Sequence, residues 1–477
     1  MSLVHRNWVG GEQLAPVDQG PNLNPSDLDS PVGDYARGDA EQARQAVQAA
    51  RAAFPAWSAR SPQDRADLLE RAGLLVLERR EALGRLLSSE EGKTLAEGVG
   101  EVARAGQILK FFAGEALRLS GERLASVRVG VDVEITREPV GVFGLITPWN
   151  FPIAIPVWKA APALAYGNTV VLKPADMTPG SAWALAEILH EAGLPPGVFN
   201  LVMGPGRTVG DALVGDPGVD GISFTGSVPT GRAIAARCAG GGKRVQCEMG
   251  GKNPLVVLDD AELDKAVAAA LNGAFFSTGQ RCTASSRLIV TEGVHDRFVG
   301  ALTEGMAALK IGHALDPATQ IGPVADEAQF RKDLEYIQTA AGEGGRVTGG
   351  RALERETRGL FLEPALITET TPAMRINREE VFGPVASVIR VRDYDEALHV
   401  ANDTEFGLSA GLCTTSLAKA RHFLRHAQAG MVMVNLPTAG VDPHVPFGGR
   451  KASSFGPREQ GSYAREFYTV VKTGYIG

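Results

Sequence analysis

The stretch GNTVVLKPADMTPGSAWALAEILHEAGLPPGVFNLVMG, residues 167–204, decides the fold class of this chain. Its apolar run TVVLK has the length of a buried strand and stops at a proline. A polar turn follows, then a helical segment, GSAWALAEILHEAG, and a second strand in GVFNLVMG. Because a helix between two strands favours parallel pairing in one sheet, the stretch predicts an α/β fold with helices covering a parallel sheet.

The pattern changes on both sides of this stretch. Toward the N-terminus, residues 39–54 and 61–80 carry apolar side chains at helical spacing, and Asp39 and Ser61 fit the position of an N-cap. Residues 126–146 are rich in β-branched side chains that alternate with other residues, which predicts strands. Further short apolar runs, each expected to contain a strand, lie at 219–227 and 253–260.

The composition limits the function classes that the chain can belong to. Its 477 residues suffice for two or three domains, and 44% hydrophobic and 22% charged residues are ordinary for a globular protein. A net charge of −7 argues against an electrostatic grip on nucleic acid. No apolar run of about 18 residues predicts a membrane span, and no signal peptide is recognisable. With four cysteines, we expect a cytoplasmic protein with reduced thiols and no metal site.

Two turns could bind the phosphates of a dinucleotide. In ISFTGSVPTGRAIAARC, Gly226 and Ser227 lie between a strand and a helix that carries Gly231. The free N–H groups at the start of such a helix could hold an anion. The second turn, MGPGRTVG, holds Gly206 and Gly210 in a looser spacing. Neither turn has the G-x-G-x-x-G fingerprint, so each also fits an ordinary turn.

Two residues that follow the first strand of the opening stretch could bind a ribose. Lys173 and Asp176 lie at the carboxyl end of that strand. Open α/β sheets bind ligands at this edge, so the two side chains could bond to ribose hydroxyls. An exposed lysine and aspartate on an ordinary loop would give the same pattern.

Three residues could carry chemistry. Cys282 follows Arg281 in the polar stretch STGQRCTASSR, and a nearby cation would favour the nucleophilic thiolate. Asn150, between two aromatic residues in LITPWNFP, could donate to a developing oxyanion. Glu248, beside small residues in CEMGGKNP, could be a general base because apolar surroundings raise a carboxyl pKa. Taken alone, each residue also fits a structural role as a buried thiol, a buried amide or a surface carboxylate.

These motifs occur together and in one order that resembles the aldehyde dehydrogenase superfamily over essentially the whole chain. The pattern continues downstream with EEVFGPV (379–385), MVNLP around Asn435, PFGGRKASSFG (446–456) and PREQG (457–461). So many ordered motifs make a chance similarity negligible. The joint pattern therefore favours the catalytic interpretation of Asn150, Glu248 and Cys282 over the structural one.

The resemblance implies an aldehyde dehydrogenase-like α/β fold in three parts. A Rossmann-type NAD(P)-binding domain would contain residues 1–118 and 140–250. An α/β catalytic domain would contain residues 251–454. An oligomerisation arm of residues 119–139 and 455–477 would add a strand to the sheet of a partner subunit, which predicts a homodimer or a homotetramer.

The resemblance also implies roles for individual residues. Asn150 and the backbone N–H of Cys282 would form an oxyanion hole, and Glu248 would be the base. Lys159 would belong to the network around the base, and Glu459 would help the proton to leave. The cofactor would contact Ile146, Thr147, Pro148, Trp149, Lys173, Ala175, Asp176, Gly206, Gly210, Thr225, Gly226, Ser227, Gly231, Met249, Gly250, Glu380 and Phe382. The substrate would contact Phe151, Ile155, Trp158, Arg281, Thr283 and Phe447.

A reaction follows from these implied roles. The Cys282 thiolate attacks the aldehyde carbon, hydride transfer leaves a thioester, and water activated by Glu248 hydrolyses the thioester to the acid. A glutamate at the base position favours hydrolysis over transfer to coenzyme A. The expected cofactor is NAD or NADP. The negative charge of Asp176 would repel the 2′-phosphate of NADP, which favours NAD. Its side chain is shorter than that of a glutamate, however, and leaves room for this phosphate.

The substrate signal is weaker than the family signal. GQRCTASSRLIV and the segment 433–461 most resemble the branch of the family that oxidises α-ketoglutaric semialdehyde (2,5-dioxovalerate), and Arg281 could steer an anionic substrate. Succinic or succinylglutamic semialdehyde is the alternative, because GQRC also occurs in enzymes for those substrates. Two interpretations from other classes also stay open: a non-catalytic structural protein of this fold, and a thiol hydrolase that cleaves esters without a cofactor.

Overall fold

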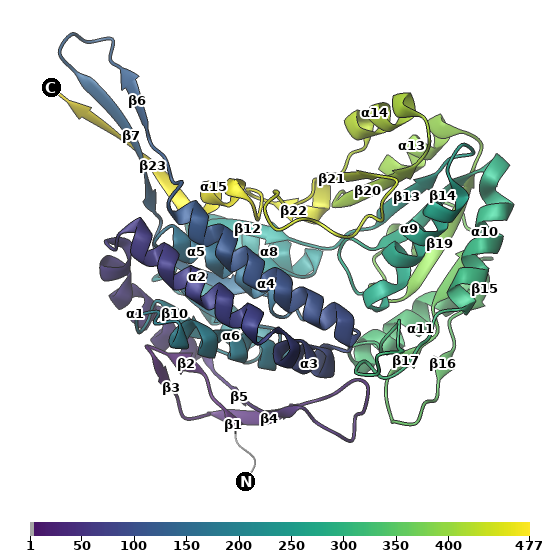
Figure 1. Ribbon diagram of the computed structural model, residues 1–477, viewed down its shortest axis with the longest axis horizontal. Helices are drawn as coiled ribbons and strands as arrows, with labels where there is room; N and C mark the ends of the chain where they lie inside the picture. The colour runs from purple at the N-terminus through teal and green to yellow at the C-terminus, as the bar shows by residue number, and fades with distance from the viewer. Residues whose placement is uncertain (1–3) are drawn as a thin grey trace.

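Two large sheets, helices that cover them and a projecting three-stranded arm form the part of the chain that the structure describes (Figure 1). The structure is a computed structural model and describes residues 4–477. Among these residues, no helix is long and apolar enough to cross a membrane. The fold is α/β, as predicted.

The first large sheet has eight strands, and its five central strands are parallel. Its central strands are buried on both faces: Phe143 and Leu145 belong to the core on one side, and Val142 and Ile146 to the core on the other. Two buried faces explain why these strands are continuous apolar runs. In order across the sheet, the strands are β22 (Ser454–Phe455), β12 (Arg244–Glu248), β11 (Gly221–Thr225), β8 (Val142–Ile146), β9 (Thr169–Lys173), β10 (Phe199–Leu201), β2 (Trp8–Val9) and β3 (Glu12–Gln13).

Strand β8 is the point at which the chain changes its direction across this sheet. The strands β9 and β10 follow on one side of β8, and β11 and β12 on the other side. At such a point a crevice forms outside the carboxyl ends of parallel strands, and ligands bind there. The loops after β8 and β11 therefore border the expected ligand crevice.

The second large sheet has seven strands, all parallel except β15 at one edge. Helices α9 and α10 pack with the core on one face, and α13 and α14 with the core on the other. In order, the strands are β15 (Arg346–Gly349), β18 (Ala365–Thr368), β19 (Val385–Val391), β14 (Ser285–Thr291), β13 (Asn253–Val257), β20 (Ser409–Cys413) and β21 (Met431–Val434). The strands predicted in 219–227 and 253–260 are thus β11 and β13.

Both predicted N-terminal helices are present, with the predicted caps. The Asp39 carboxylate accepts a hydrogen bond from Gln42 N at 2.9 Å, and the Ser61 hydroxyl accepts one from Asp64 N at 3.1 Å. The second helix ends at Glu78, earlier than predicted, because a separate helix begins at Arg80. The helices are α1 (Ala40–Ser58), α2 (Pro62–Glu78), α3 (Arg80–Glu91), α4 (Leu95–Ala116), α5 (Ala154–Ala165), α6 (Pro179–Glu191), η1 (Gly206–Gly210), α7 (Asp211–Gly215), α8 (Val228–Gly240), α9 (Leu263–Phe275), η2 (Phe276–Gly279), α10 (Glu292–Ala307), α11 (Glu327–Gly342), α12 (Arg375–Arg378), α13 (Tyr394–Asn402), α14 (Leu417–His426), η3 (Lys451–Ser453), η4 (Ser462–Ala464) and α15 (Arg465–Tyr468).

The arm is an antiparallel sheet that extends away from both large sheets (Figure 1). The strand prediction for 126–146 is correct for β7 and β8 and wrong for residues 126–131, which form the tip of the hairpin. Val127 and Val129 there are fully exposed, because no strand lies opposite them. The arm strands are β23 (Thr469–Ile476), β7 (Asp132–Pro139) and β6 (Glu122–Ala125), and the smaller sheets contain β1 (Val4–His5), β5 (Gly33–Arg37), β4 (Asp18–Asn22), β16 (Ala352–Leu353) and β17 (Phe361–Leu362).

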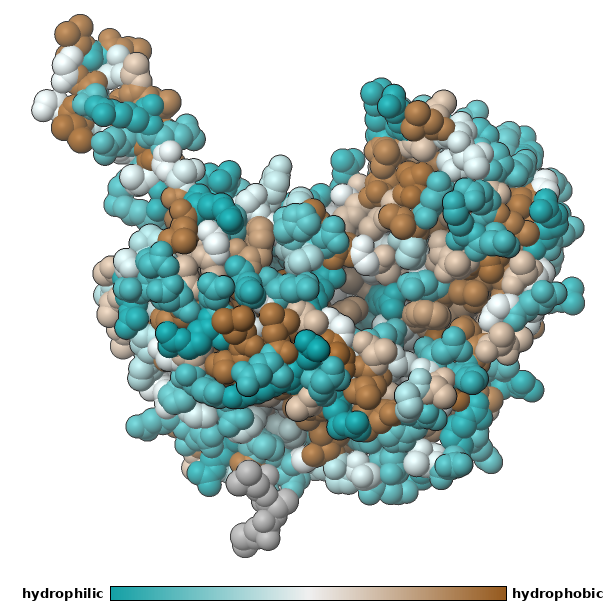
Figure 2. Space-filling model, viewed as in Figure 1, coloured by the Kyte–Doolittle hydropathy of each residue, from teal (hydrophilic) through white to brown (hydrophobic). Residues whose placement is uncertain are grey.

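The three sheets suggest a division of the chain. We propose that the eight-stranded sheet marks the NAD(P)-binding domain (1–118 and 140–250), the seven-stranded sheet the catalytic domain (251–454), and the three-stranded sheet the arm (119–139 and 455–477). The space-filling view shows a hollow between the two larger bodies (Figure 2). The site described next lies where the loops of the two large sheets meet.

Candidate functional site

Cys282 lies in a strained loop between η2 and β14. Before it, Ser277, Thr278 and Gly279 have φ angles of 51°, 56° and 64°, a left-handed run that costs about 1–3 kcal/mol for each non-glycine residue. Glu97 on α4 holds this run, because its carboxylate accepts hydrogen bonds from Ser277 N at 2.8 Å and Ser277 Oγ at 2.9 Å. Strain that the surroundings maintain in this way is typical of a functional loop.

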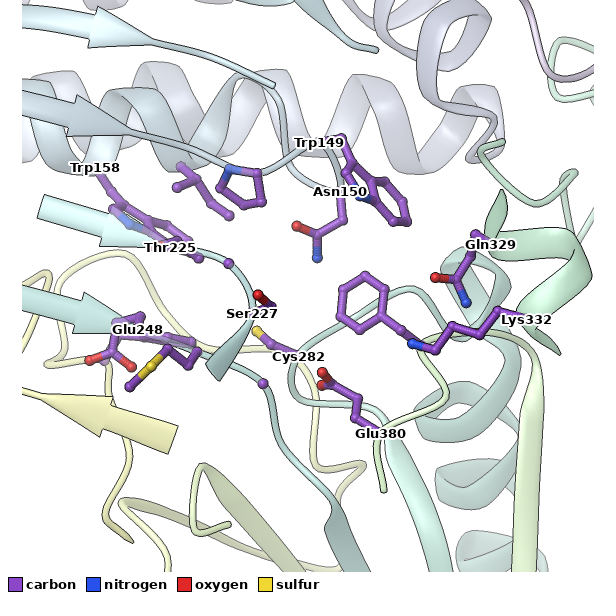
Figure 3. Close-up of a pocket in the computed structure, with 17 residues that line it drawn as sticks. Trp149, Asn150, Trp158, Thr225, Ser227, Glu248, Cys282, Gln329, Lys332 and Glu380 are labelled. Carbon is purple, nitrogen blue, oxygen red and sulfur yellow. The ribbon is translucent and has the colours of Figure 1, made fainter. Parts of the chain in front are cut away.

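Two cavities meet at Cys282. The cofactor-side cavity, about 190 Å³, lies outside the carboxyl ends of β8 and β11 (Figure 3). It is lined by Pro148, Trp149, Asn150, Ile155, Trp158, Thr225, Gly226, Ser227, Glu248, Met249, Gly250, Cys282, Gln329, Lys332, Glu380, Phe382 and Phe447. The substrate-side cavity, about 280 Å³, is lined by Lys93, Glu97, Gly100, Glu101, Arg104, Phe151, Ala154, Trp158, Ser277, Arg281, Cys282, Thr283, Ala439, Gly440, Val441 and Phe447.

The structure brings many of the predicted cofactor residues together around the first cavity. Those that line it are Pro148, Trp149, Thr225, Gly226, Ser227, Met249, Gly250, Glu380 and Phe382. Those that do not line it are Ile146, Thr147, Lys173, Ala175, Asp176, Gly206, Gly210 and Gly231. Of these, Lys173 donates a hydrogen bond to Asp176 at 3.1 Å, and Asp176 lines a smaller cavity beside Arg37.

The start of α8 fits a phosphate. Ser227 precedes this helix and makes no side-chain cap, so the first N–H groups of α8 are available to an anion. A Cβ atom on Gly226 would lie 2.6 Å from the Phe224 ring, and one on Gly231 would lie 2.5 Å from the Met249 sulfur. Both glycines thus permit the close packing of this turn and helix. The residues present fit the pyrophosphate of a dinucleotide.

Glu380 and Phe382 complete the cofactor-side cavity from the second sheet. The Glu380 carboxylate accepts a hydrogen bond from Gly251 N at 2.8 Å and points into the cavity near Cys282 (Figure 3). Phe382 has a left-handed φ of 71°, and its ring meets Trp149 edge-on, with centroids 5.4 Å apart. A carboxylate acceptor beside this aromatic pair suits a ribose and a flat ring.

The Cys282 thiol is protonated in its present surroundings. Burial raises its pKa to about 12, and the carboxylates of Glu380 and Glu248 add to the effect. The sequence suggested that Arg281 favours the thiolate, but burial is the larger effect. The Arg281 guanidinium instead donates to Glu97 at 3.2 Å, to Asn272 on α9 and to Ser277 of its own loop. The thiol therefore needs a change in its surroundings to become nucleophilic.

Asn150 is held with its amide nitrogen toward Cys282 (Figure 3). Its Nδ2 donates to the Gln280 carbonyl at 3.0 Å, which leaves a second N–H for a substrate oxygen. The backbone carbonyl of Asn150 accepts a hydrogen bond from Lys93 Nζ at 2.7 Å, and Lys93 also pairs with Glu101 at 2.7 Å. This buried ion pair fixes the asparagine, so the amide can serve as a preorganised donor.

Glu248 turns its carboxylate away from Cys282 (Figure 3). Its Oε2 accepts a hydrogen bond from Ser454 Oγ at 2.5 Å, and its Oε1 is buried without a partner. Burial, and next the charge of Glu459, raise the pKa of Glu248 well above its usual value. The carboxyl is therefore poised as a weak acid, and it must rotate toward the sulfur to act as a base there.

A charged network lies behind Glu248. Lys159 Nζ pairs with Glu459 and donates to Ser223 Oγ at 2.8 Å, and both charged side chains are buried. Ser223 Oγ donates to Glu459 Oε1 at 3.2 Å, whereas Glu459 Oε2 is buried and has no partner. Glu248 and Glu459 thus each have one buried carboxylate oxygen without a partner, and the charge of Glu459 acts on Glu248.

The predicted substrate residues surround Cys282 on its second side. Phe151, Trp158, Arg281, Thr283 and Phe447 line the substrate-side cavity, whereas Ile155 lines only the cofactor-side cavity. Sequence reasoning missed several lining residues: Lys93, Glu97, Glu101, Arg104, Gln329 and Lys332. Charged residues on the buried face of α4 were a usable signal, because they interrupt its apolar stripe. The residues on α11 belong to no motif.

The described residues contain no group of three or more His, Cys, Asp or Glu side chains that could hold a metal ion. His422 and His426 do have the i, i+4 spacing on α14, which the sequence analysis passed over. Their rings stack at 4.1 Å, and the Tyr394 hydroxyl lies 2.7 Å from His422 Nδ1. Two histidines and a neutral phenol make a surface aromatic cluster without a third metal ligand.

Comparisons with known proteins all give one family. The sequence model of the aldehyde dehydrogenase family matches residues 11–474. The α-ketoglutarate semialdehyde dehydrogenase of Haloferax volcanii is 44% identical over 99% of this chain and 98% of that protein. The NADP⁺-dependent succinate-semialdehyde dehydrogenase of Escherichia coli is 39% identical over 100% and 97%. The crystal structure of Staphylococcus aureus betaine aldehyde dehydrogenase with NAD⁺ has a TM-score of 0.96 and 35% identity, and covers 99% and 95% of the chains.

Proposed function

Because the chain belongs to the aldehyde dehydrogenase family and works with NAD⁺ or NADP⁺, we propose that it oxidises a carboxylated semialdehyde, namely α-ketoglutaric semialdehyde to α-ketoglutarate. The charge of the substrate-side cavity carries this proposal. Three cations line it, Lys93, Arg104 and Arg281, against two carboxylates, Glu97 and Glu101. The surplus of one positive charge suits an aldehyde with one carboxylate and disfavours a cationic one.

We propose that Cys282 is the nucleophile. The thiol first releases its proton to water in the cavity, and the sulfur then bonds to the aldehyde carbon as a thiolate. The charge that develops on the aldehyde oxygen is stabilised by Asn150 Nδ2 and the backbone N–H of Cys282. The bound dinucleotide would be held by the α8 N-terminus, Ser227 and Glu380, and it supplies the two-electron acceptor that takes the hydride. The acyl group then remains on the sulfur as a thioester.

We propose that Glu248 removes a proton from the water that attacks this thioester. The carboxylate rotates from Ser454 toward Cys282, the C–S bond breaks, and the acid leaves. Lys159 and Glu459 would then relay the proton, since Glu459 has a buried, unpaired oxygen and its charge acts on Glu248. Lys173 and Asp176, already in contact, would hold the adenosine ribose.

Other functions fit fewer features of the site. Succinic or succinylglutamic semialdehyde also carries a carboxylate, so either is the alternative substrate. A non-catalytic structural protein would not need the set formed by Cys282, Asn150 and Glu248 around two cavities. A thiol hydrolase acting on esters would not need an uncapped helix start next to a cavity that also holds Glu380 and Phe382.

A steady-state panel tests the proposed substrate. We expect kcat/KM for α-ketoglutaric semialdehyde to exceed that for pentanal, the neutral aldehyde of equal chain length, by about 10- to 100-fold, the usual size of one charge-assisted contact. Formation of NADH and NADPH is followed with these aldehydes and with succinic and succinylglutamic semialdehyde. Preference for pentanal would overturn the proposal, and preference for another semialdehyde would select that alternative.

We further propose that the protein is a cytoplasmic homodimer or homotetramer joined through the arm. Apolar side chains that a monomer would leave in water support this assembly. They are Leu124, Val127, Val129, Val471, Tyr475 and Ile476. Light scattering of the full chain should give two or four times the chain mass, and a chain that ends at Tyr468, without β23, should give a smaller assembly. A monomeric full-length chain would contradict this proposal.

A further inference from the structure

The three cations of the substrate-side cavity differ in how much of their hydrogen-bonding capacity the protein already uses. Lys93 donates to Glu101 Oε2 and to the backbone carbonyl of Asn150, each at 2.7 Å. Arg281 donates to Glu97 at 3.2 Å, and its other bonds go to residues of its own loop and of α9. Both cations therefore hold the site together and have little capacity left for a substrate.

Arg104 has hydrogen-bond donors that the protein does not use. Its Nη2 donates one long hydrogen bond, 3.3 Å, to the neutral Gln460 Oε1, and its Nε is buried without a partner. Among the described residues, it forms no ion pair within 4.0 Å. A buried donor without an acceptor costs free energy, which a bound acceptor would recover. A guanidinium with a free Nε–H and a weakly held Nη2–H offers the parallel pair of donors that fits a carboxylate.

The position of Arg104 suits the far end of a short substrate. It projects from α4 one turn after Glu101, and its Cζ lies 6.0 Å from the centroid of the Trp158 ring. The Trp158 ring lies 5.3 Å from that of Phe447, and both rings also line the walls next to Cys282. An apolar passage thus leads from the sulfur toward the guanidinium. Burial lowers the pKa of Arg104, and the charges of Glu101 and Asp442 oppose that effect.

We propose that Arg104 is the residue that selects anionic semialdehydes, by binding the carboxylate of the substrate through Nε and Nη2. This inference rests on the proposed function, and it moves the charge recognition from Arg281, which the sequence had suggested, to a residue on α4. Arg281 then has a positioning role, because its hydrogen bond to Glu97 connects the loop of Cys282 to α4. A cationic aldehyde in this cavity would meet the Arg104 charge at close range and be rejected.

Kinetics of Arg104→Met test the inference. This variant keeps the unbranched chain as far as the position of Nε and removes the guanidinium with its charge and its donors. We expect KM for succinic semialdehyde and α-ketoglutaric semialdehyde to rise about 10- to 100-fold, with kcat changed by less than about threefold, because a ground-state contact is lost. KM for butanal and pentanal should stay the same or fall. Arg104→Lys should recover part of the loss, since it restores the charge without the fork.

Lys110→Met is the matched control, because Lys110 is an exposed cation on the same helix. It should leave all four KM values unchanged. If Arg104→Met weakens the charged and neutral aldehydes equally, or leaves their ratio unchanged, the assignment of Arg104 is wrong while the proposed function stands. If the wild type itself prefers the neutral aldehydes, the proposed function fails first. Should Arg104→Met not fold, Arg104→Lys and Arg104→Gln supply the same comparison.

Discussion

Replacement of Cys282 by alanine should reduce the oxidation of every aldehyde by at least about 10⁴-fold, the usual scale for the loss of a catalytic nucleophile. The reason is that no other thiol reaches the two cavities: Cys238, Cys247 and Cys413 are buried and line neither of them. The measurement is the formation of reduced cofactor at saturating aldehyde. Binding of the dinucleotide should survive, because its proposed contacts lie on other residues.

Cys413→Ala is the control for this variant, because that thiol is buried in the core of the second sheet. It should change stability slightly and leave turnover within about tenfold of the wild type. Alkylation adds a second readout. Because burial raises the pKa of Cys282 to about 12, iodoacetamide should label the free enzyme slowly at neutral pH and faster as the pH rises. Wild-type turnover by Cys282→Ala would exclude the sulfur as the nucleophile.

Replacement of Glu248 by glutamine should separate the two halves of the reaction. Because water can take the proton of the thiol, attack and hydride transfer do not need Glu248, so each active site should produce one equivalent of reduced cofactor in a rapid burst. Steady turnover should then fall about 10²- to 10⁴-fold, as expected for the loss of general-base catalysis, with the acyl group retained on Cys282. Rapid-mixing absorbance measures the burst, and mass spectrometry measures the acyl group.

The pH profile of the wild type tests the same assignment. Burial and Glu459 raise the pKa of Glu248, so its neutral form is favoured at low pH and the base form appears as the pH rises. Hydrolysis of the thioester should therefore speed up with pH through that raised pKa, and this rise should be absent from Glu248→Gln. Ser454→Ala is the control, since it removes a contact of the resting carboxyl and keeps the base. Steady turnover by Glu248→Gln at the wild-type rate would exclude Glu248.

The sequence predicted those parts of the fold that local pattern determines. The buried strands β8, β9, β11 and β13 are continuous apolar runs, and the caps Asp39 and Ser61 mark helix starts by their own chemistry. The prediction failed at residues 126–131, where alternation was present but no strand lies opposite. Alternation indicates a strand only when a partner exists, and the partner depends on the rest of the chain.

In the candidate site too, residues in local motifs could be predicted, and residues that depend on long-range contacts could not. Asn150, Glu248 and Cys282 lie in short motifs whose order along the chain could be recognised. Arg104 could not be found that way. Its proposed role depends on a guanidinium Nε without an acceptor and on a cavity assembled from distant segments, and neither belongs to a local motif. Likewise, the resting position of Glu248 depends on Ser454, a long-range contact that no local pattern encodes.

The arrangement of two cavities on opposite sides of one sulfur has a consequence for inhibitor design. The two cavities share Cys282 but differ in most of their lining residues, so an electrophile that occupies the substrate-side cavity need not displace a nucleotide from the other. A warhead with a carboxylate tail would then alkylate the loaded enzyme, and adding more nucleotide would not rescue it. Only compounds that bind in the substrate-side cavity would protect Cys282.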